Sequence, residues 1–368
     1  MLHDQINHII VILLFGALVL LAFIHFANPL KVNKKGNIWF AMFLLLYSSF
    51  WLEEIAAFSG VGEIGGYMVT LIHMIQIFTA PVLYLSIVYY TELTFRLNIK
   101  HWFHFIIPIV YITIGVVSYY RQEVASVIFI WSVVIMLVQA VLYTYLSYFK
   151  IKQHQQKILI YSSNTAGIEL KWLKYIVLQI IFLCVIVILH NIFISTSDLN
   201  AFVNGVQLVT VFFIAYFSCQ QKEIYPVKED QKKELQFVHE ENIQSSNKRR
   251  LVDDAELLVF KEKLLELMDK EHPYLDSELN LVRLAEMLSI TPHQLSYIIN
   301  TGFNENFFQF INKYRVERAK TLLCSNRDVK MLAIAFDAGF NSKTAFNTTF
   351  KKITHQTPSE YRRTCSDL

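Results

Sequence analysis

The sequence predicts an all-α protein in which a seven-helix transmembrane bundle is followed by a cytoplasmic module of two helix-turn-helix units. Three observations predict this fold. Of the 368 residues, 54% are hydrophobic and only 17% are charged, a balance that soluble domains seldom have. Seven long apolar runs precede residue 221, and a charged segment with two similar helix-turn-helix patterns follows it. The expected division is a membrane domain at 1–220, a linker at 221–252 and a helical module at 253–368.

The membrane domain is predicted from the apolar runs, each close to the about 20 residues that cross a bilayer as one helix. They lie at 8–28, 38–58, 66–91, 102–120, 124–149, 172–195 and 201–220. The first run lacks a basic leader and a convincing small-residue cleavage site, so a retained span is favoured over a secretory signal. Pro81 and Pro108 fall inside two of the runs, where proline is expected only to kink the helix.

The distribution of lysine and arginine predicts the orientation of the spans. The loops after spans one, three and five carry ten basic residues, whereas the loops on the other side carry only Arg121. Because basic residues concentrate in cytoplasmic loops, the N-terminus is expected outside and the segment after residue 220 inside. The ten residues are Lys31, Lys34, Lys35, Arg96, Lys100, Lys150, Lys152, Lys157, Lys171 and Lys174.

Polar residues inside the apolar runs are the only indication of what the bundle detects. Several fall in the outer half of the membrane under the predicted orientation, where they form a candidate ligand pocket open to the exterior. Its residues are Glu53, Glu54, His73, Gln76, His190, Asn191, Asn204 and Gln207. His25, Gln139 and Gln179 lie nearer the inner half. The alternative is that the glutamates only reach water at the interface and the amides form ordinary hydrogen bonds between helices.

The cysteines and the linker carry little functional information. Cys184, Cys219, Cys324 and Cys365 are far apart in the sequence, so we expect four unpaired thiols and neither a zinc site nor another metal site. The polar linker contains the basic stretch 248–250. Lys248, Arg249 and Arg250 suit contact with anionic lipid or DNA phosphate, although a solvated surface is the simpler interpretation.

The first helix-turn-helix unit is predicted from a helix start at Thr291. A charged helix at 253–271 with one apolar stripe comes first and ends at Pro273. A short helix follows at 281–288, and then Thr291, Pro292 and Gln294 supply a capping hydroxyl, a first-turn proline and the partner of a capping box. Two helices joined by such a short turn have the geometry that places a recognition helix in the major groove.

The second unit repeats this arrangement about fifty residues later. Asp328 is expected to cap a helix whose apolar residues are Met331, Leu332, Ala335 and Phe336, and Gly339 suits its left-handed end. Asn341 and Ser342 then start a helix with Phe346 and Phe350 facing inward. Between the units, 306–325 is predicted as one amphipathic helix with Phe310, Ile311, Tyr314, Ala319 and Leu322 in the core. At about 1.5 Å per residue, it can hold two recognition helices nearly one DNA turn apart.

Charge and exposed polar residues indicate which side of this module meets DNA. Residues 253–286 hold ten acidic and four basic residues, whereas 311–363 hold eleven basic and four acidic ones. The later part should therefore face phosphate, and binding should depend strongly on salt. The candidate reading residues of the first recognition helix are His293, Gln294, Ser296, Tyr297 and Asn300. Those of the second are Ser342, Lys343, Thr344, Asn347, Thr348, Lys351 and Lys352. Amides such as Gln294 and Asn347 pair with adenine, and lysine pairs with guanine or phosphate.

From Leu281 to Arg363 the sequence closely resembles the DNA-binding domain of the AraC/XylS family. The stretches that carry the resemblance are LAEMLSITPHQLSYIIN, NFFQFINKYRVERAKTLL, MLAIAFDAGFNSKTAFNTTFKK and TPSEYRR. The resemblance covers about 85 to 110 residues and implies two helix-turn-helix units on a shared linker helix, inserted into successive major grooves of a promoter. Usual members carry a soluble partner domain that binds a metabolite, and the seven spans depart from that pattern.

The sequence thus predicts a membrane-bound transcription regulator, not an enzyme, with no cofactor. It is expected in the inner membrane of a bacterium. The expected partners are double-stranded promoter DNA, the lipid bilayer, an unidentified ligand or signal, a second copy of the chain and RNA polymerase. One alternative is an intramembrane enzyme that uses Glu53, His73 and His190, although no nucleophile motif or phosphate loop supports it. Another is an anchored factor released by proteolysis in 228–250. A transporter is disfavoured because no paired interrupted spans are visible.

Overall fold

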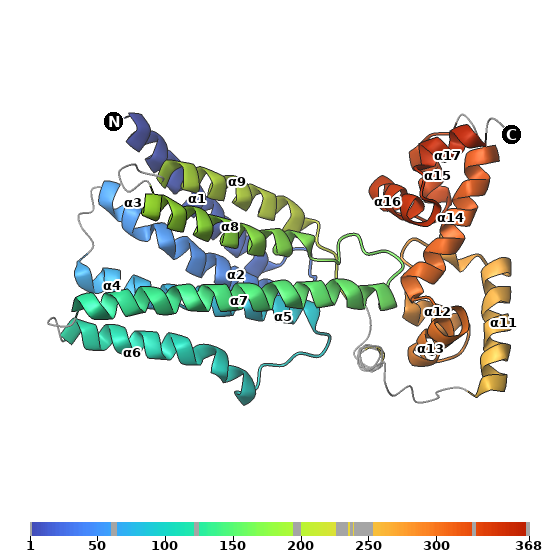
Figure 1. Cartoon of the computed structure of the whole chain (residues 1–368), viewed down its shortest axis with the longest axis horizontal. Helices are drawn as coiled ribbons and strands as arrows, with labels where there is room; N and C mark the ends of the chain where they lie inside the picture. Colours follow the sequence, from blue (N-terminus) through green and yellow to red (C-terminus); the bar gives the residue numbers. More distant parts are fainter. Residues whose placement is uncertain are drawn as a thin grey trace. The chain divides into compact units, whose positions relative to one another are not determined.

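The computed structural model describes residues 2–59, 65–120, 125–193, 200–225, 235, 238, 253–325 and 329–365. Among these residues every regular element is a helix, and one isolated antiparallel bridge joins Ser162 to Asn280. The all-α prediction is therefore confirmed for this part of the chain (Figure 1). Its contacts form two compact units. The bundle unit comprises Met1–Gln153 and Leu170–Ile224, and the C-terminal unit comprises His154–Glu169 and Tyr225–Leu368.

The bundle unit consists of long apolar helices with short breaks. Helix α1 packs against α2 and α9, and α2 also packs against α5. The helices are α1 (Leu2–Ala27), α2 (Lys34–Ser48), η1 (Ser49–Trp51), α3 (Leu52–Phe58), α4 (Gly66–Gln76), α5 (Thr79–Thr91), η2 (Ile99–Phe105), α6 (Ile106–Tyr120), α7 (Ala125–Tyr161), α8 (Lys171–Phe193) and α9 (Asn200–Cys219). The last part of α7, from His154, belongs to the C-terminal unit.

Six helical segments within the described residues are long and apolar enough to cross a membrane. They are Asp4–Ala27, Lys34–Phe58, Met68–Thr91, Ile99–Val117, Val134–Tyr161 and Ala201–Cys219. The predicted run at 172–195 forms α8, which is not among the six, so the count of seven stays a prediction. Much of the apolar surface of these helices faces outward: Phe23 on α1, Val141 on α7 and Val209 on α9 are 67%, 69% and 70% exposed.

A proline in the third segment creates a polar contact inside the bundle. Pro81 lies in the first turn of α5 and has no N–H to donate to the carbonyl oxygen of Ile77, four residues earlier. That oxygen instead accepts a hydrogen bond from Gln139 Nε2 of α7, at 2.8 Å. The carbonyl oxygen left free at the break between α4 and α5 is thus paired by a side chain from another helix.

Besides the end of α7, residues 253–325 and 329–365 of the C-terminal unit form eight helical elements, whose starts and ends follow the predicted positions closely. They are α11 (Asp254–Lys270), η4 (Pro273–Leu275), α12 (Leu281–Met287), α13 (Pro292–Phe303), α14 (Phe307–Ser325), α15 (Met331–Asp337), α16 (Lys343–Thr354) and α17 (Pro358–Thr364). The pairs α12–α13 and α15–α16 are the two helix-turn-helix units, and α14 joins them (Figure 1).

The apolar core of the second unit forms between α14, α15, α16 and α17. Phe346 and Phe350 are fully buried in it, as predicted, together with Ala335. Leu332 and Phe336 are 44% and 51% exposed, because the buried side of the two-turn helix α15 is formed by Ile334 and Ala335 instead, and Ala338 directly after the helix is also buried. Of the predicted core of α14, the residues Phe310, Ile311 and Ala319 are buried, and Tyr314 and Leu322 are partly buried.

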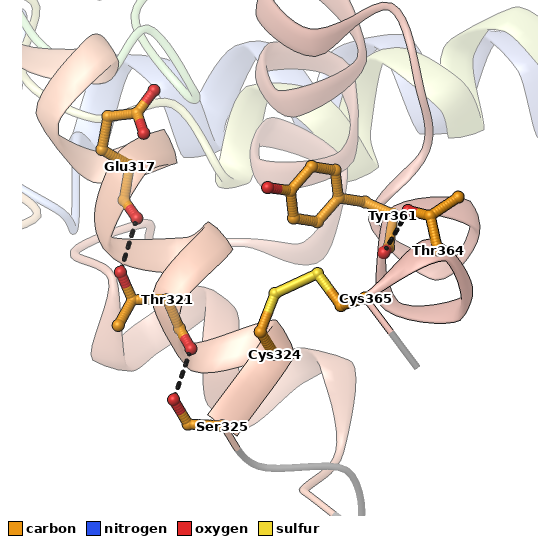
Figure 2. The surroundings of a disulfide bond; sticks show 7 residues. All are labelled: Glu317, Thr321, Cys324, Ser325, Tyr361, Thr364 and Cys365. Atoms are coloured by element: carbon orange, nitrogen blue, oxygen red, sulfur yellow. Dashed lines mark hydrogen bonds between the residues drawn. A yellow bond between two sulfur atoms is a disulfide. The ribbon is translucent and has the colours of Figure 1, made fainter. Parts of the chain in front are cut away.

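The prediction of four unpaired thiols is wrong for two of the cysteines. Cys324 near the end of α14 and Cys365 directly after α17 form a disulfide that joins positions 41 residues apart (Figure 2). Packing of α17 against α14 brings them together, with Cα atoms 5.4 Å apart, and sequence spacing contains no sign of that packing. Cys219 is free and exposed.

Some predicted features lie outside the residues or side chains that the structure describes. These are Arg121, the linker stretch 228–250 with Lys248, Arg249 and Arg250, the proposed cap Asp328, and the side chains of Cys184, His190 and Asn191.

Candidate DNA-binding interface

The first recognition helix, α13, starts at the predicted capping box. Thr291 Oγ1 accepts a hydrogen bond from the backbone N–H of Gln294 at 3.2 Å, and Gln294 Oε1 accepts one from the N–H of Thr291 at 3.0 Å. Pro292 occupies the first turn, where its missing donor costs nothing. Two otherwise unpaired N–H groups are satisfied at the end of the helix that is expected to enter the groove.

The side chains of α13 divide into a buried and a partly exposed side. Leu295, Ile298 and Ile299 are at most 1% exposed. The predicted reading residues His293, Gln294, Tyr297 and Asn300 are partly exposed, whereas Ser296 is only 5% exposed. Asn300 Nδ2 donates to Ser296 Oγ at 3.4 Å. Ser296 is therefore placed to orient Asn300 and does not itself reach the surface.

In the second helix-turn-helix unit, the turn between α15 and α16 contains Gly339. Its φ of +88° lies in the left-handed region that favours glycine, as predicted. A Cβ at this position would overlap the carbonyl oxygen of Tyr274 and lie 2.9 Å from Leu275 Cα. The turn of the second helix-turn-helix unit therefore packs directly on η4, which precedes the first helix-turn-helix unit. This contact requires glycine at position 339.

The second recognition helix, α16, presents a basic and polar surface. Ser342 caps it by accepting a hydrogen bond from the N–H of Ala345 at 3.1 Å. All seven predicted reading residues lie at its cap or on its outer side. Ser342 and Asn347 are partly exposed, and Lys343, Thr344, Thr348, Lys351 and Lys352 are exposed. The opposite side is formed by Phe346, Thr349 and Phe350, which are all buried.

The side chain of Arg315 on α14 forms a network of buried hydrogen bonds in this domain, a role that the sequence pattern does not predict. It is 1% exposed. Its Nε donates to the carbonyl oxygen of Tyr274 and its Nη2 to that of Asp276, both at 2.8 Å. Nη1 donates to the carbonyl oxygen of Ser163 at 3.1 Å, and Nη2 also donates to Ser163 Oγ at 3.0 Å. Burial lowers the pKa of Arg315 to about 10, so the group remains charged at neutral pH. It is a structural residue and does not contribute to the phosphate-facing charge.

Ser163 belongs to a segment that is distant from the domain in sequence, since it lies 152 positions before Arg315. This segment, His154–Glu169, lies in the C-terminal unit. Ser163 Oγ donates to the carbonyl oxygen of Leu279 at 2.6 Å, and Asn312 Nδ2 donates to the carbonyl oxygen of Ser163 at 3.0 Å. The only sign of this contact in the sequence is that Arg315 falls among the apolar residues of a predicted amphipathic helix. That sign does not identify Ser163 as its partner.

In the bundle, the described side chains of the predicted ligand pocket take part in several separate contacts. His73 Nε2 lies 2.9 Å from Glu53 Oε1, and both side chains are partly exposed. Glu54 accepts a hydrogen bond from Asn7, which in turn accepts one from Asn204 at 3.0 Å. Asn204 accepts one from Trp51 Nε1 at 2.8 Å. Among the described side chains of the predicted set, Gln76 and Gln207 line a cavity of the bundle.

Comparison with known proteins identifies the C-terminal region. A family model described as a helix-turn-helix domain matches residues 284–364. An uncharacterized HTH-type transcriptional regulator of Staphylococcus aureus (strain COL) is 33% identical over 101 residues, which cover 27% of this chain and 13% of that protein. The uncharacterized HTH-type transcriptional regulator YijO of Escherichia coli (strain K12) is 36% identical over 87 residues, which cover 24% of this chain and 30% of that protein.

A solved structure also matches this region. The C-terminal domain of the two-component response regulator yesN from Fusobacterium nucleatum is 33% identical, with a TM-score of 0.26, over 28% of this chain and 96% of that one. The chain spans less than a third of the length of the two curated relatives above. Within that span the motifs, the fold and the relatives agree: the C-terminal part of the chain is an AraC-type helix-turn-helix DNA-binding domain, as found in transcription regulators.

Proposed function

We propose that this protein is a membrane-bound, sequence-specific transcription regulator whose helical bundle detects a signal and controls promoter binding by the AraC-type domain. The partners in this proposal are promoter DNA, the bilayer and the ligand of the bundle. A second copy of the chain and RNA polymerase join them on the promoter. The location is the inner membrane of a bacterium, with the domain on the cytoplasmic side.

One observation carries the coupling part of the proposal. His154–Glu169, which belongs to the C-terminal unit and bonds to Arg315 through Ser163, is a continuation of α7 and leads directly into α8. A shift of α7 or α8 is therefore transmitted along the chain to His154–Glu169. This segment is hydrogen-bonded to α14, the helix that joins the two recognition helices. The same segment follows the fifth predicted span, whose loop is expected in the cytoplasm from its lysines, and this supports the proposed orientation.

The bundle supports the membrane part. In five of the six candidate spans, no more than 33% of the apolar window is buried within the protein, and a water-soluble protein seldom exposes apolar patches of this extent. A signal controls the domain only if it binds the two states of the bundle with different affinity. Coupling free energies between such sites are typically about 1 to 3 kcal/mol, which is enough to change promoter occupancy several-fold.

If α16 reads DNA as proposed, substitutions at two of its residues should have different effects. Lys351→Ala should weaken binding to all DNA sequences and reduce the slope of log affinity against log salt by about 1, because one phosphate contact is lost. Asn347→Ala should instead relax the preference at one base pair by about 1 to 3 kcal/mol, because an amide that reads a base edge is lost. The measurement is DNA binding by the full chain in lipid nanodiscs, using genomic fragments selected by the unaltered chain.

The control for this experiment is Lys270→Ala on the acidic helix α11, where Lys270 pairs with Glu266 at 2.6 Å. This change should leave both affinity and salt dependence unaltered. Equal binding by the unaltered chain and by the Asn347 and Lys351 variants would show that α16 is not the recognition helix.

A further inference from the structure

The bundle contains a cavity of about 250 Å³, and none of its lining residues lies in the C-terminal domain. Residues of α2, α5, α7, α8 and α9 line it, and all of them belong to the bundle unit. Its wall is mostly apolar and contains Phe43, Leu83 and Leu183. Among the lining side chains that the structure describes, none is a lysine, arginine, aspartate, glutamate or histidine. The cavity therefore suits an uncharged occupant with an apolar body.

Gln139 supplies a fixed hydrogen-bond acceptor in this cavity. Its side chain is 1% exposed, and Oε1 has no hydrogen-bond partner in the structure, whereas Nε2 donates to the carbonyl oxygen of Ile77. The amide cannot turn over without placing Oε1 against that carbonyl oxygen, which Pro81 leaves without a backbone donor. Buried polar atoms are nearly always paired. The unpaired Oε1 therefore calls for a donor from an occupant.

We propose that this cavity binds a small uncharged amphiphile whose hydroxyl or other donor pairs with Gln139 Oε1. Thr79 Oγ1, which also lines the cavity and has no hydrogen-bond partner in the structure, is a second polar contact for the same group. The volume exceeds the about 150 Å³ of a cavity that holds benzene and lies below the about 300 to 1,000 Å³ typical of sites for drug-sized ligands. A ring with a short alkyl chain matches this size.

The position of the cavity gives its occupant a means of control, and this step rests on the proposed function. Gln139 and Tyr143 lie on α7, and Val177 and Leu183 lie on α8. These two helices flank His154–Glu169, the segment bonded to Arg315. An occupant between α7 and α8 thus contacts both chain connections to that segment.

The binding test uses 4-butylphenol and butylbenzene, which differ by one hydroxyl. Each is titrated into the full chain in nanodiscs of phosphatidylethanolamine and phosphatidylglycerol, and the signal from empty discs is subtracted. We expect the phenol to bind about tenfold more tightly, as one hydrogen bond to a buried acceptor provides. Gln139→Leu should remove most of this difference. Equal affinity of the two compounds for the unaltered chain would overturn the proposal.

A second variant keeps the test valid if Gln139→Leu fails to fold. Ala140→Phe fills the cavity but leaves the bond from Gln139 to Ile77 in place, and it should abolish binding of both compounds. Val138→Phe is the matched control, because Val138 is on the same helix but 59% exposed and is not among the lining residues. It should bind both compounds normally. Unchanged binding by the Ala140→Phe variant would also overturn the site.

The natural amphiphile has two sources, a diffusible small molecule or an uncharged membrane lipid with a free hydroxyl. Discs that contain dioleoylglycerol distinguish them: a weaker apparent affinity for butylphenol identifies the lipid, and an unchanged affinity identifies the diffusible molecule. The titration needs no DNA. Butylphenol that binds without changing promoter affinity would contradict the proposed coupling and leave the site established, so the two failures are distinct.

Discussion

Gly339→Ala is expected to cause the largest loss of stability in the C-terminal domain, about 3 to 5 kcal/mol. An L-residue at a φ of +88° is strained, and the new methyl group would overlap the backbone of Tyr274. Backbone atoms cannot rotate away as the end of a side chain can, so η4 and the turn of the second unit must separate. The measurement is pulse proteolysis of the full chain in nanodiscs across a urea series, following the surviving C-terminal domain.

Gly302→Ala is the matched control for this prediction. Gly302 lies in α13, and a Cβ there would meet only Lys261 Cδ at 3.6 Å, an ordinary contact. Because alanine favours a helix over glycine, this variant should be as stable as the unaltered chain or more stable by up to about 1 kcal/mol. A Gly339→Ala variant with the same urea midpoint as Gly302→Ala would show that η4 does not pack on this turn.

Arg315→Met is expected to destabilise the same domain by about 3 kcal/mol or more. The change removes the Arg315 donor from the carbonyl oxygens of Tyr274, Ser163 and Asp276. Ser163 keeps its bond from Asn312 and Asp276 keeps one from the N–H of Leu279, so the largest loss is at Tyr274. A buried acceptor left without a donor costs about 1 to 3 kcal/mol, and each other lost bond costs about 1 kcal/mol. Arg318→Met, three residues further along α14 and exposed, should change stability by less than about 0.5 kcal/mol. Both are measured by the same proteolysis.

A double-mutant cycle tests whether Arg315 holds the segment that contains Ser163. Ser163→Ala alone should cost about 1 kcal/mol, because it removes bonds to Arg315 and to the carbonyl oxygen of Leu279. If the two side chains interact as the structure shows, the double variant should lose less than the sum of the single losses, by about 0.5 kcal/mol or more. Additive losses would contradict the hydrogen bond between Arg315 and the Ser163 hydroxyl.

The features that were predictable from sequence depend on interactions within a few residues. The capping box of Thr291 and Gln294 spans three positions, and a left-handed helix end is typical of a glycine such as Gly339. Helical spacing was sufficient to predict that Phe346 and Phe350 are buried. Local patterns of this kind are therefore enough to predict where α13 and α16 begin and which of their side chains are exposed, with the exception of Ser296, which lies inward.

The features that sequence did not predict depend on contacts between distant residues. Arg315 and Ser163 are 152 positions apart, and Cys324 meets Cys365 only through the packing of α17 on α14. The exposure of Leu332 and Phe336 follows from which side of α15 its neighbours cover, which a two-turn pattern leaves open. Gln139 was recognised as a polar residue within a span, but its role depends on the carbonyl oxygen that Pro81 leaves free on another helix.

The central claim, that one chain joins a membrane bundle to a promoter-binding domain, is tested most directly by the DNA that accompanies the protein in membranes. Cells that express the full chain are cross-linked, their membranes are floated on a density gradient, and the co-floating DNA is sequenced. The account predicts a discrete set of promoter fragments that disappears in the Asn347→Ala, Lys351→Ala double variant. Membranes that carry no enriched fragments, or the same fragments with that variant, would contradict it.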